Sequence, residues 1–501
     1  MRDLTRQSKS VASLLTLFGL LFFPALAASQ TVNLTWDAST SQDTVGYNVY
    51  RGANPDGPYH KINSILDPNI SYSDGTVQVG KTYYYVTTAV DNQGVESAYS
   101  NQTEAVIPAG GSGSENALYS FAGGGDPKLP YAGLIFDKAG NLYGTSEFGG
   151  TYNQGTVFEI TPNSNGSWTE SVLYSFTGSE DGAQPYGSLV FDSSGNLYGT
   201  TNFGGDTNCN LGCGTVFKLS PGSSGWTESV LYTFTGGSDG GEPDARVLFD
   251  AAGNLYGTTL LGGSINSACT SGCGTIFKLA HGSSGWTESI IYAFQGGTDG
   301  LSPYDGLAFD AAGNLYGSTY AGGSGYGVIF KLTPGSSGWA ETVLHAFRGG
   351  YDGKSPYGDL ILDGSGNLYG TASQGGYQGY GVVFEMLLNT KGRWAEKVLH
   401  SFANTPAGNP VAGLAIDTAG NLYGTTMLGA TRASCGGGCG ALFKLAPASG
   451  GWTYKVVHDF GHGADGYHPT GDLILDSTGN LYGTTQAGGA QGSGMVFEIM
   501  H

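Results

Sequence analysis

The chain has 501 residues, of which 88 are glycine and only 12% are charged, and its net charge is −20. Collagen needs glycine at every third position and abundant proline, and disorder goes with few aromatics; this chain has 18 prolines, 31 tyrosines and 23 phenylalanines. The acidic balance argues against nucleic acid and anionic membrane surfaces as partners, and the glycine content argues against helices. The composition therefore predicts a folded all-β protein with many tight turns.

The first 28 residues have the pattern of a secretory signal peptide. Three basic residues precede an apolar run over residues 11–23, and Ala25-Leu26-Ala27 supplies a small-x-small cleavage pattern. An uncleaved membrane anchor is the alternative, but the apolar run is short for a span. We expect an exported protein, secreted or at the cell surface, with no membrane span after cleavage and a mature net charge of −22.

Residues 29–108 contain few glycines and read as alternating strands. The clearest strands are Val32–Trp36, Gly46–Tyr50 and Thr82–Val86. The early Trp36, the Tyr-x-x-Tyr strand and the tyrosine-rich strand resemble a fibronectin type III domain. That resemblance implies a β-sandwich that acts as a spacer or adhesive module without chemistry of its own. Residues 109–116, rich in glycine and serine, read as a flexible linker.

Residues 117–501 contain seven copies of one repeat. Only eight of the 88 glycines lie at or before residue 110, and the others mark the linker and this repeat. The string Gly-Asn-Leu-Tyr-Gly recurs at intervals of 53 to 60 residues, a length that suits one propeller blade. Its asparagines are Asn141, Asn196, Asn254, Asn314, Asn367, Asn421 and Asn480. The prolines eleven residues before them are Pro130, Pro185, Pro243, Pro303, Pro356, Pro410 and Pro469.

Each copy holds four strand-like pieces, and an Asp-x-x-Gly-Asn turn joins the first two. In the second copy the pieces span residues 186–191, 196–201, 214–219 and 226–234. A solenoid is the main alternative, but solenoids need atypical capping repeats. The seventh copy stops after its third strand, whereas residues 117–121 match a fourth strand without its copy, which would close a ring and hide both edges. We therefore predict a seven-bladed β-propeller closed by its N-terminal strand.

Three strings of the repeat carry a family resemblance. The Gly-Asn-Leu-Tyr-Gly-Thr core, the Gly-Thr-Val-Phe strand and the Leu-Tyr-Ser-Phe strand resemble the bacterial GloVer repeat over residues 117–501. The resemblance implies an extracellular propeller-like array whose members carry various surface anchors, and it implies no particular activity. The glycine doublet after the second strand and the later tryptophan also resemble Kelch blades, more loosely.

Six cysteines form three Cys-x-x-x-Cys pairs, and each pair lies in a variable loop between the second and third strands. The pairs occur only in the copies whose Asn-to-Phe segment is lengthened to 21, 22 or 23 residues. They are Cys209/Cys213, Cys269/Cys273 and Cys435/Cys439. In an exported protein we expect three local disulfides. Zinc is the alternative, but no pair has a second pair or a histidine nearby in sequence. We expect no metal and no cofactor.

Three further patterns predict architecture rather than catalysis. Gly236–Gly240 matches Gly-x-Ser-x-Gly, but it lies between copies, without the strand and helix of a nucleophile elbow. His458, His462 and His468 form the one histidine cluster, and a metal site there is the alternative to His458 simply holding the place of a tyrosine in other copies. The aspartate that opens the Asp-x-x-Gly-Asn turn recurs in all copies, so we expect it to cap backbone N–H groups.

We expect the binding surface on the face that carries the variable loops. In a four-stranded meander these loops share one face with the connections between copies, and loops carry function. The candidate binding residues there are Tyr131, Tyr186, Tyr304 and Tyr357, each directly after a repeat proline. They could stack on sugars or grip a protein. The alternative is that they only wedge neighbouring blades apart.

We favour an exported, non-catalytic propeller that binds an extracellular protein or carbohydrate, and we expect a monomer. The sequence offers no catalytic constellation. The alternative is a secreted polysaccharide hydrolase or lyase, which needs acids that break the repeat pattern. The candidates for that role are Asp244, Asp305, Asp359 and Asp472, whose scatter over four copies weakens the case. A purely structural surface-layer protein is a third hypothesis.

Overall fold

The computed structural model describes residues 15–17, 32–106 and 115–500, except 42, 56, 75, 78–80, 284, 390, 404–406, 430–437 and 462–464. Every regular element among the described residues is a β-strand, and the strands form several separate sheets, which confirms the all-β prediction. The chain divides into two compact units, the first comprising residues 1–112 with 476–480 and 500–501, and the second comprising residues 113–475 and 481–499. Most of the predicted signal peptide (1–28) and most of the predicted linker (109–116) lie outside the described residues.

The first unit consists of two antiparallel sheets that share one core. The sheets are β1 (Leu15–Leu17), β2 (Val32–Trp36) and β5 (Ser71–Asp74), and β4 (His60–Lys61), β3 (Thr44–Gly52), β6 (Thr82–Asp91) and β7 (Thr103–Val106). Val32, Leu34 and Trp36 are all buried because alternate side chains of a strand point to one face. The Trp36 ring meets the Tyr47 ring edge-on, with centroids 5.4 Å apart. Strand β1 comes from the apolar run of the predicted signal peptide and pairs with β2.

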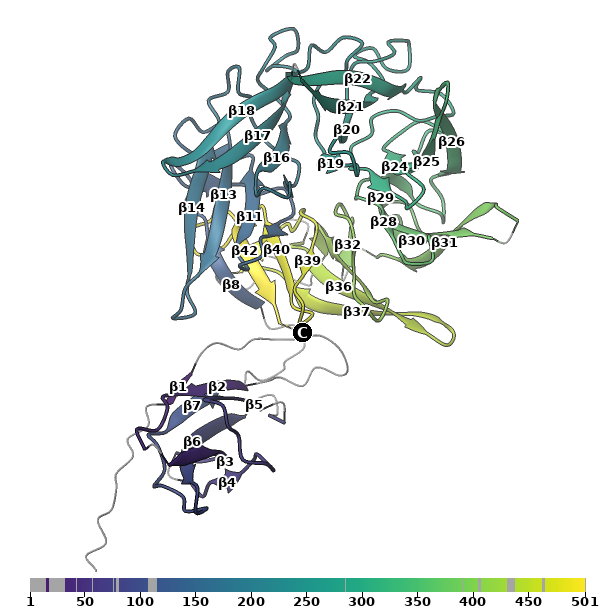
Figure 1. The fold of residues 1–501 in the computed structure, drawn as a ribbon. Helices are drawn as coiled ribbons and strands as arrows, with labels where there is room; N and C mark the ends of the chain where they lie inside the picture. The colour runs from purple at the N-terminus through teal and green to yellow at the C-terminus, as the bar shows by residue number, and fades with distance from the viewer. Residues whose placement is uncertain are drawn as a thin grey trace, which may run out of the picture. The chain divides into compact units, whose positions relative to one another are not determined.

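In the second unit each copy of the repeat forms a four-stranded antiparallel core sheet (Figure 1). The first strands are β10 (Ile135–Phe136), β15 (Val190–Phe191), β19 (Leu248–Phe249), β23 (Ala308–Phe309), β28 (Ile361–Leu362), β33 (Ala415–Ile416) and β39 (Ile474–Leu475). The second are β11 (Leu142–Ser146), β16 (Leu197–Thr201), β20 (Leu255–Thr259), β24 (Leu315–Thr319), β29 (Leu368–Gln374), β34 (Leu422–Thr426) and β40 (Leu481–Thr485).

The third and fourth strands of each sheet are longer than its first strand. The third strands are β13 (Thr156–Pro162), β17 (Thr215–Gly222), β21 (Thr275–Gly282), β25 (Val328–Gly335), β30 (Val382–Leu388), β36 (Ala441–Ala448) and β42 (Met495–Ile499). The fourth strands of the first six copies are β14 (Trp168–Ser175), β18 (Gly225–Thr233), β22 (Gly285–Ala293), β26 (Gly338–Ala346), β31 (Trp394–Ser401) and β37 (Gly451–Asp459). Short additional strands are β9 (Pro127–Lys128), β12 (Phe148–Gly149), β27 (Lys354–Pro356), β32 (Ala407–Gly408), β35 (Leu428–Gly429), β38 (Gly466–Tyr467) and β41 (Ala487–Gly488).

The fourth strand of the seventh sheet comes from the start of the second unit. Strand β8 (Glu115–Ser120) pairs antiparallel with β42, so Ser120 lies opposite Met495 and Glu115 opposite Ile499. A buried cluster also joins the first and seventh copies, because Leu142 and Phe158 pack with Tyr482 and Val496. The sequence predicted this pairing of the chain start with the last copy.

The first strand of each copy is shorter than the sequence predicts. In the second copy β15 begins at Val190, whereas we expected a strand from residue 186. The preceding carbonyls are bonded to the neighbouring copy rather than within a strand ladder: the Thr145 hydroxyl donates to the Gly187 carbonyl at 3.2 Å. Thr484 of the seventh copy donates in the same way to Ala132 of the first, at 2.9 Å.

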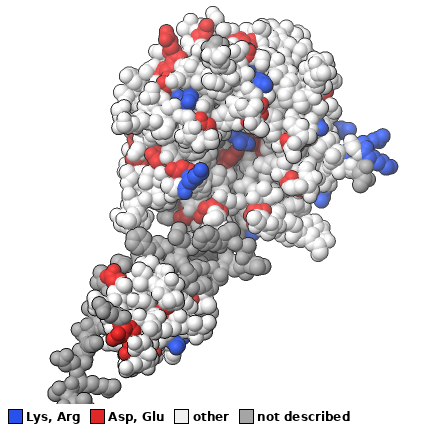
Figure 2. Space-filling view, in the orientation of Figure 1, with Lys and Arg blue, Asp and Glu red and all other residues white. Residues whose placement is uncertain are grey.

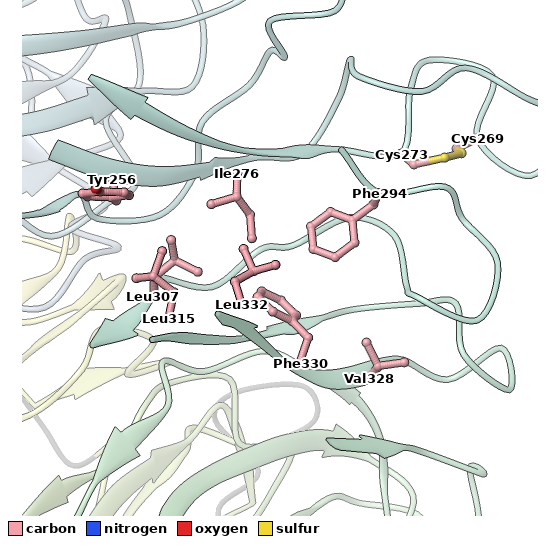
Figure 3. Packing of buried hydrophobic residues seen from close by; sticks show 10 residues of the cluster. All are labelled: Tyr256, Cys269, Cys273, Ile276, Phe294, Leu307, Leu315, Val328, Phe330 and Leu332. Atoms are coloured by element: carbon pink, nitrogen blue, oxygen red, sulfur yellow. A yellow bond between two sulfur atoms is a disulfide. The ribbon is translucent and has the colours of Figure 1, made fainter. Parts of the chain in front are cut away.

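Hydrophobic side chains fill the spaces between consecutive sheets. Figure 3 shows the cluster of the third and fourth copies, in which Tyr256 and Ile276 pack with Leu315 and Phe330. Burying side chains of this size stabilises the fold by roughly 1.5–3 kcal/mol each. The residue four places after each repeat proline always enters such a cluster; these are Leu134, Leu189, Val247, Leu307, Leu360, Leu414 and Leu473, exposed by 5% or less.

In all seven copies the aspartate of the Asp-x-x-Gly-Asn turn accepts two backbone N–H groups and the asparagine side-chain amide. In the fourth copy Asp310 accepts the backbone N–H of Ala312 and Asn314, the Asn314 side-chain amide and the Tyr316 hydroxyl, at 2.7–3.0 Å. Burial raises the pKa of Asp310, but these hydrogen bonds to its charged form outweigh burial and leave the pKa lowered. The predicted capping role of this aspartate is confirmed.

Candidate binding site

A pocket of about 70 Å³ is lined by residues that follow the repeat proline in all seven copies. The fourth residue after each proline packs into the core between sheets, whereas the pocket is lined by residues one to three places after the proline. The residues one place after the proline are Tyr131, Tyr186, Asp244, Tyr304, Tyr357, Val411 and Thr470. Those three places after it include Ser188, Arg246, Asp359 and Asp472. A volume of about 70 Å³ holds a few water molecules, so a larger ligand must lie over the opening.

A strained turn fixes where these side chains point. The residue before each repeat proline has a left-handed backbone, with φ between 52° and 59°, although none of the seven is glycine. Such a conformation costs roughly 1–2 kcal/mol per residue, and it recurs because both backbone groups are bonded. In the fifth copy Ser355 donates its N–H to the Tyr326 carbonyl at 2.8 Å, and its own carbonyl accepts the Ser373 hydroxyl at 2.9 Å.

The four tyrosines named from the sequence lie together. The Tyr131 and Tyr357 hydroxyls, from the first and fifth copies, are 3.1 Å apart and share a hydrogen bond. The Tyr304 and Tyr357 rings stack with centroids 5.1 Å apart, and the Tyr131 and Tyr186 rings meet edge-on at 5.2 Å. Burial raises the pKa of Tyr131 to about 12, so its phenol stays protonated. None of the four belongs to the clusters between sheets, which disfavours the wedge alternative.

A fifth tyrosine completes this group, and sequence reasoning missed it. The Tyr320 ring contacts the rings of Tyr304 and Tyr357, with centroids at 5.4 and 6.2 Å. It stands six residues after the repeat asparagine, at the end of the second strand. That position varies between copies, and this variation was the available signal; its residues are Glu147, Asn202, Leu260, Tyr320, Ser373, Met427 and Gln486. Two of the others also reach the group: Glu147 accepts the Tyr186 hydroxyl and Asn202 donates to Asp244.

The four acids that looked scattered in sequence line the same pocket. Their scatter along the chain is no argument against a shared site, because the first three positions after the repeat prolines of different copies line one pocket. Arg246 of the third copy pairs with Asp359 of the fifth. The backbone N–H groups of Gly306 and Gly413 donate to Asp359 and Asp472, at 2.6 and 2.5 Å. Asp305 accepts the Ser318 hydroxyl.

Burial makes these acids unusual. It raises the pKa of Asp244 to about 7, against a weaker opposing effect of the Asn202 hydrogen bond. It also raises the pKa of Asp472 to about 7, aided by the nearby Asp359 charge and opposed by Arg246. The pKa of Asp305 rises far above its ordinary value for the same reason, and its side chain is 5% exposed. Asp359 instead raises the pKa of Arg246, which stays charged. Carboxyl groups that titrate near neutrality can exchange protons with a ligand.

The described disulfides are structural supports at the edge of this face. Cys209–Cys213 and Cys269–Cys273 are bonded, whereas Cys435 lies outside the described residues, which leaves the Cys435–Cys439 pair a prediction. Cys209 packs over Gly236, where a β-carbon would lie 2.4 Å from its sulfur. Tyr326 covers the equivalent Gly349 in the fourth copy, and both glycines have φ of 74°. The disulfide therefore takes the place of an aromatic ring in a longer loop.

The histidine cluster divides between two places. His458 lies 3.2 Å from Asp465 and 3.6 Å from Glu115, and the three groups are close enough to meet at one ion. Tyr174 contacts Asp181 in the same way at 3.0 Å, so His458 holds the recurrent place of a tyrosine. His468 precedes a repeat proline, and His462 lies outside the described residues.

The Gly-x-Ser-x-Gly string lies in the connection between β18 and β19. There the Asp239 carboxylate accepts the Thr235 N–H and the Tyr232 hydroxyl, at 2.8 and 3.1 Å. Because the part of the chain that the structure describes has no helix, this string is not a nucleophile elbow. Nor does that part contain a helix long and apolar enough to cross a bilayer. On the face shown in Figure 2 acidic groups are spread over the surface, and several basic groups gather at the right edge of the second unit.

The molecule is thus an all-β repeat protein whose copies surround a pocket of tyrosines and acids. The model of the Gloeobacter/Verrucomicrobia repeat family matches residues 72–326 and 321–501. The chain belongs to this family.

Other similarities cover less or are more distant. An amylopullulanase of Thermoanaerobacter thermohydrosulfuricus is 41% identical over 96 residues, which are 19% of this chain and 6% of that protein, so this chain spans only a small part of its length. A Fn3-like protein from Clostridium thermocellum is 38% identical over 16% of this chain and 79% of its own, with a TM-score of 0.15. The extracellular domain of a one-component system from B. thetaiotaomicron is 14% identical over 97% of this chain and 52% of its own, with a TM-score of 0.49.

Proposed function

We propose that residues 117–501 form a seven-bladed β-propeller and that the exported protein binds a carbohydrate at the pocket on its axis. Three contacts support ring closure: the β8–β42 ladder, the cluster of the first and seventh copies, and the bond from Thr484 to Ala132. A pocket lined by all seven copies is what the axis of such a ring would present.

A fibronectin type III domain over residues 29–108 completes this architecture. Its support is the shared core of two antiparallel sheets, with Trp36 and Tyr85 at its centre. Export is supported by the signal-peptide pattern and by the two disulfides, which persist in oxidising compartments.

The observation that carries the binding proposal is the group of five tyrosines with Asp244. Tyrosine rings stack on the C–H faces of sugars, and phenols and carboxyl groups bond to sugar hydroxyls. The five rings come from several copies and are held by each other, so the surface is formed before the ligand arrives. Protein is the weaker candidate, because the rings are partly buried and present too small an apolar area for a stable protein interface.

A glycan array, followed by titration calorimetry with the best short oligosaccharide, tests the proposal. Tyr304→Ala combined with Tyr357→Ala should weaken binding about tenfold or more, since each stacked ring contributes roughly 0.5–1.5 kcal/mol. Tyr152→Ala is the matched control, because Tyr152 is 56% exposed in a variable loop and does not line the pocket. Equal affinity of the double variant and the wild type would refute an axial sugar site.

Hydrolysis or lyase chemistry on polysaccharide is the second candidate, favoured by one observation. Asp244 stands in the tyrosine group with a pKa of about 7, so at neutral pH a large fraction of its carboxyl carries the proton that a general acid needs. Release of reducing ends or of an unsaturated product from the bound glycan would identify such an enzyme. Asp244→Asn should then abolish turnover while leaving binding in place.

A further inference from the structure

The fifth copy carries a second aromatic group outside the axial pocket. Tyr351 and Tyr377 are each 74% exposed, and their rings stack with centroids 6.0 Å apart and planes inclined by 27°. Tyr351 lies in the connection that leads into the fifth copy, and Tyr377 lies in the variable loop between β29 and β30. In a four-stranded meander the connections between copies and the loops between the second and third strands share one face. We therefore expect both loops on the face that carries the axial tyrosines, which are Tyr131, Tyr186, Tyr304, Tyr320 and Tyr357.

The repeat architecture does not require these two rings. Tyr351 stands directly before Asp352, an aspartate of the connection between copies that recurs as Asp126, Asp181, Asp239 and Asp299. In the first four copies the place of Tyr351 holds Gly125, Glu180, Ser238 and Thr298. The place of Tyr377, directly after the glycine doublet, holds Thr151, Asp206, Ser264, Ser324 and Ala490 in other copies. Both positions therefore change from small or polar to aromatic in the same copy, where the two side chains meet. Exposing two large rings to water without a ligand gains little stability.

The loops that carry the two rings are bonded to each other. The Gly376 N–H donates to the Gly350 carbonyl at 2.8 Å, and the Tyr377 N–H donates to the Ser401 hydroxyl at 2.6 Å. In the other loop the Arg348 N–H donates to the Asp352 carboxylate at 2.9 Å. These bonds hold the ring pair in place before any ligand binds, which lowers the entropy cost of binding.

The surroundings select a sugar chain over a protein. Glycines and polar residues flank the pair in sequence along both loops, among them Gly350, Asp352 and Gln378, whereas the core of a protein interface is rich in apolar residues. The net charge of −20 disfavours anionic polymers. Two exposed ring faces with polar neighbours suit a neutral pyranose, which offers a C–H face to the rings and hydroxyls to the rim.

We propose that Tyr351 and Tyr377 form an outlying subsite for a neutral polysaccharide that also occupies the axial tyrosines. This inference rests on the proposed function and narrows its ligand to a chain of sugars. The path between the two sites is short, because six residues separate Tyr351 from the axial Tyr357, and six residues span at most about 20 Å when extended. A polysaccharide that reaches both sites gains affinity from simultaneous contact, whereas a short oligosaccharide at the axis does not.

The test compares long and short ligands in three forms of the full chain: wild type, Tyr351→Ala/Tyr377→Ala, and the control Tyr152→Ala. Native gels containing pullulan, hydroxyethyl cellulose, galactomannan or arabinoxylan measure retardation by neutral polysaccharides, and alginate serves as the anionic comparison. Calorimetry with a trisaccharide of the most retarding polymer measures the axial site alone. We expect the double variant to bind that polymer at least tenfold more weakly and the trisaccharide unchanged, with the control equal to wild type.

Each of the other possible outcomes contradicts a specific part of the proposal. Wild-type affinity of the double variant for the polymer would overturn the outlying subsite and leave the axial site standing. Equal losses for polymer and trisaccharide would show that the two substitutions disturb the axial site itself, which also overturns the subsite. Retardation by alginate alone would overturn the commitment to a neutral chain. No binding of any glycan by the wild type would refute the proposed function, and this inference with it.

Discussion

The Asp-x-x-Gly-Asn turns and the positions after the repeat prolines both repeat the same backbone conformation in every copy, but their side chains differ in how far they vary between copies. At the turns all seven copies keep the same residues and the same bonds from backbone N–H groups to the aspartate, as Asp192 and Asp250 show. After the prolines the backbone is again repeated, but the side chains differ, and those that differ meet in one pocket. In a repeat protein, identity between copies indicates architecture, and difference at a fixed backbone position indicates the place where function is built.

Truncating the buried phenylalanine that follows the strand completing the seventh sheet should have the largest effect. Phe121 follows β8 and is fully buried, as is its equivalent Phe176 in the first copy. If the chain start is an integral part of the repeat unit, Phe121→Ala should lower the free energy of unfolding by about 3–5 kcal/mol, the usual cost of a large core cavity. Urea unfolding of both variants measures this. A loss below about 1 kcal/mol for Phe121→Ala beside a normal loss for Phe176→Ala would contradict closure by β8.

Breaking the ion pair in the pocket should come next. Arg246→Ala leaves Asp359 and Asp472 close together without their cation, and we expect a loss of about 2–3 kcal/mol at pH 8, below the range for fully buried pairs because Arg246 is 34% exposed. Adding Asp359→Ala should restore part of the loss, because it removes the uncompensated charge. Arg393→Ala, at an exposed turn, is the control. If the double variant were less stable than Arg246→Ala, the acids would not be held together by this arginine.

A change at the turn should affect stability without affecting binding. Asp310→Ala removes four hydrogen bonds at a partly exposed site and should cost about 2 kcal/mol. Its affinity for the sugar should equal that of the wild type, whereas Tyr304→Ala should show the reverse pattern. Thermal melting and calorimetry on the two variants sharpen the comparison directly. Weaker sugar binding by Asp310→Ala would show that the turn also serves the site.

The smallest effect concerns acid pairs between copies. Glu288 lies half-buried beside Asp239 of the connection between β18 and β19, and burial, with that nearby charge, raises its pKa to about 7. Because the folded pKa lies above the ordinary value of 4.5, the stabilisation is complete below pH 4.5 and is lost as pH rises through 7. Glu228 and Glu341 share this arrangement. Glu288→Gln cannot ionise, so at pH 9 it should be about 1 kcal/mol more stable than wild type, after allowance for solvent screening. An unchanged difference in melting temperature between pH 5 and pH 9 would argue against a raised pKa.

The local features of the fold were predictable because they are written in local periodicity. The repeat of Gly-Asn-Leu-Tyr-Gly, the strand alternation and the capping aspartates each depend on neighbours within one copy. The short first strands were not predictable in this way, since carbonyls such as that of Gly187 are bonded by the adjacent copy. The short pairs such as β9 with β12 were missed for a similar reason: they join connections that the sequence shows only as glycine-rich loops.

Part of the candidate binding site was predictable from the sequence. Tyr131, Tyr186, Tyr304 and Tyr357 were found because an aromatic residue after a proline stands out against the repeat. Asp244, Asp305, Asp359 and Asp472 depart from the repeat pattern, and the sequence shows this. It does not show that they share a pocket, because distance along the chain does not indicate which copies face each other. Tyr320 was missed because it lies at the end of another strand and joins the group only through its ring contacts.

A structure of the protein with a bound oligosaccharide tests the central claim most directly. We expect sugar density against the rings of Tyr304, Tyr320 and Tyr357, with a sugar hydroxyl within hydrogen-bond distance of Asp244. Density on the outer strands or on the first unit, with the axial tyrosines unoccupied, would contradict it.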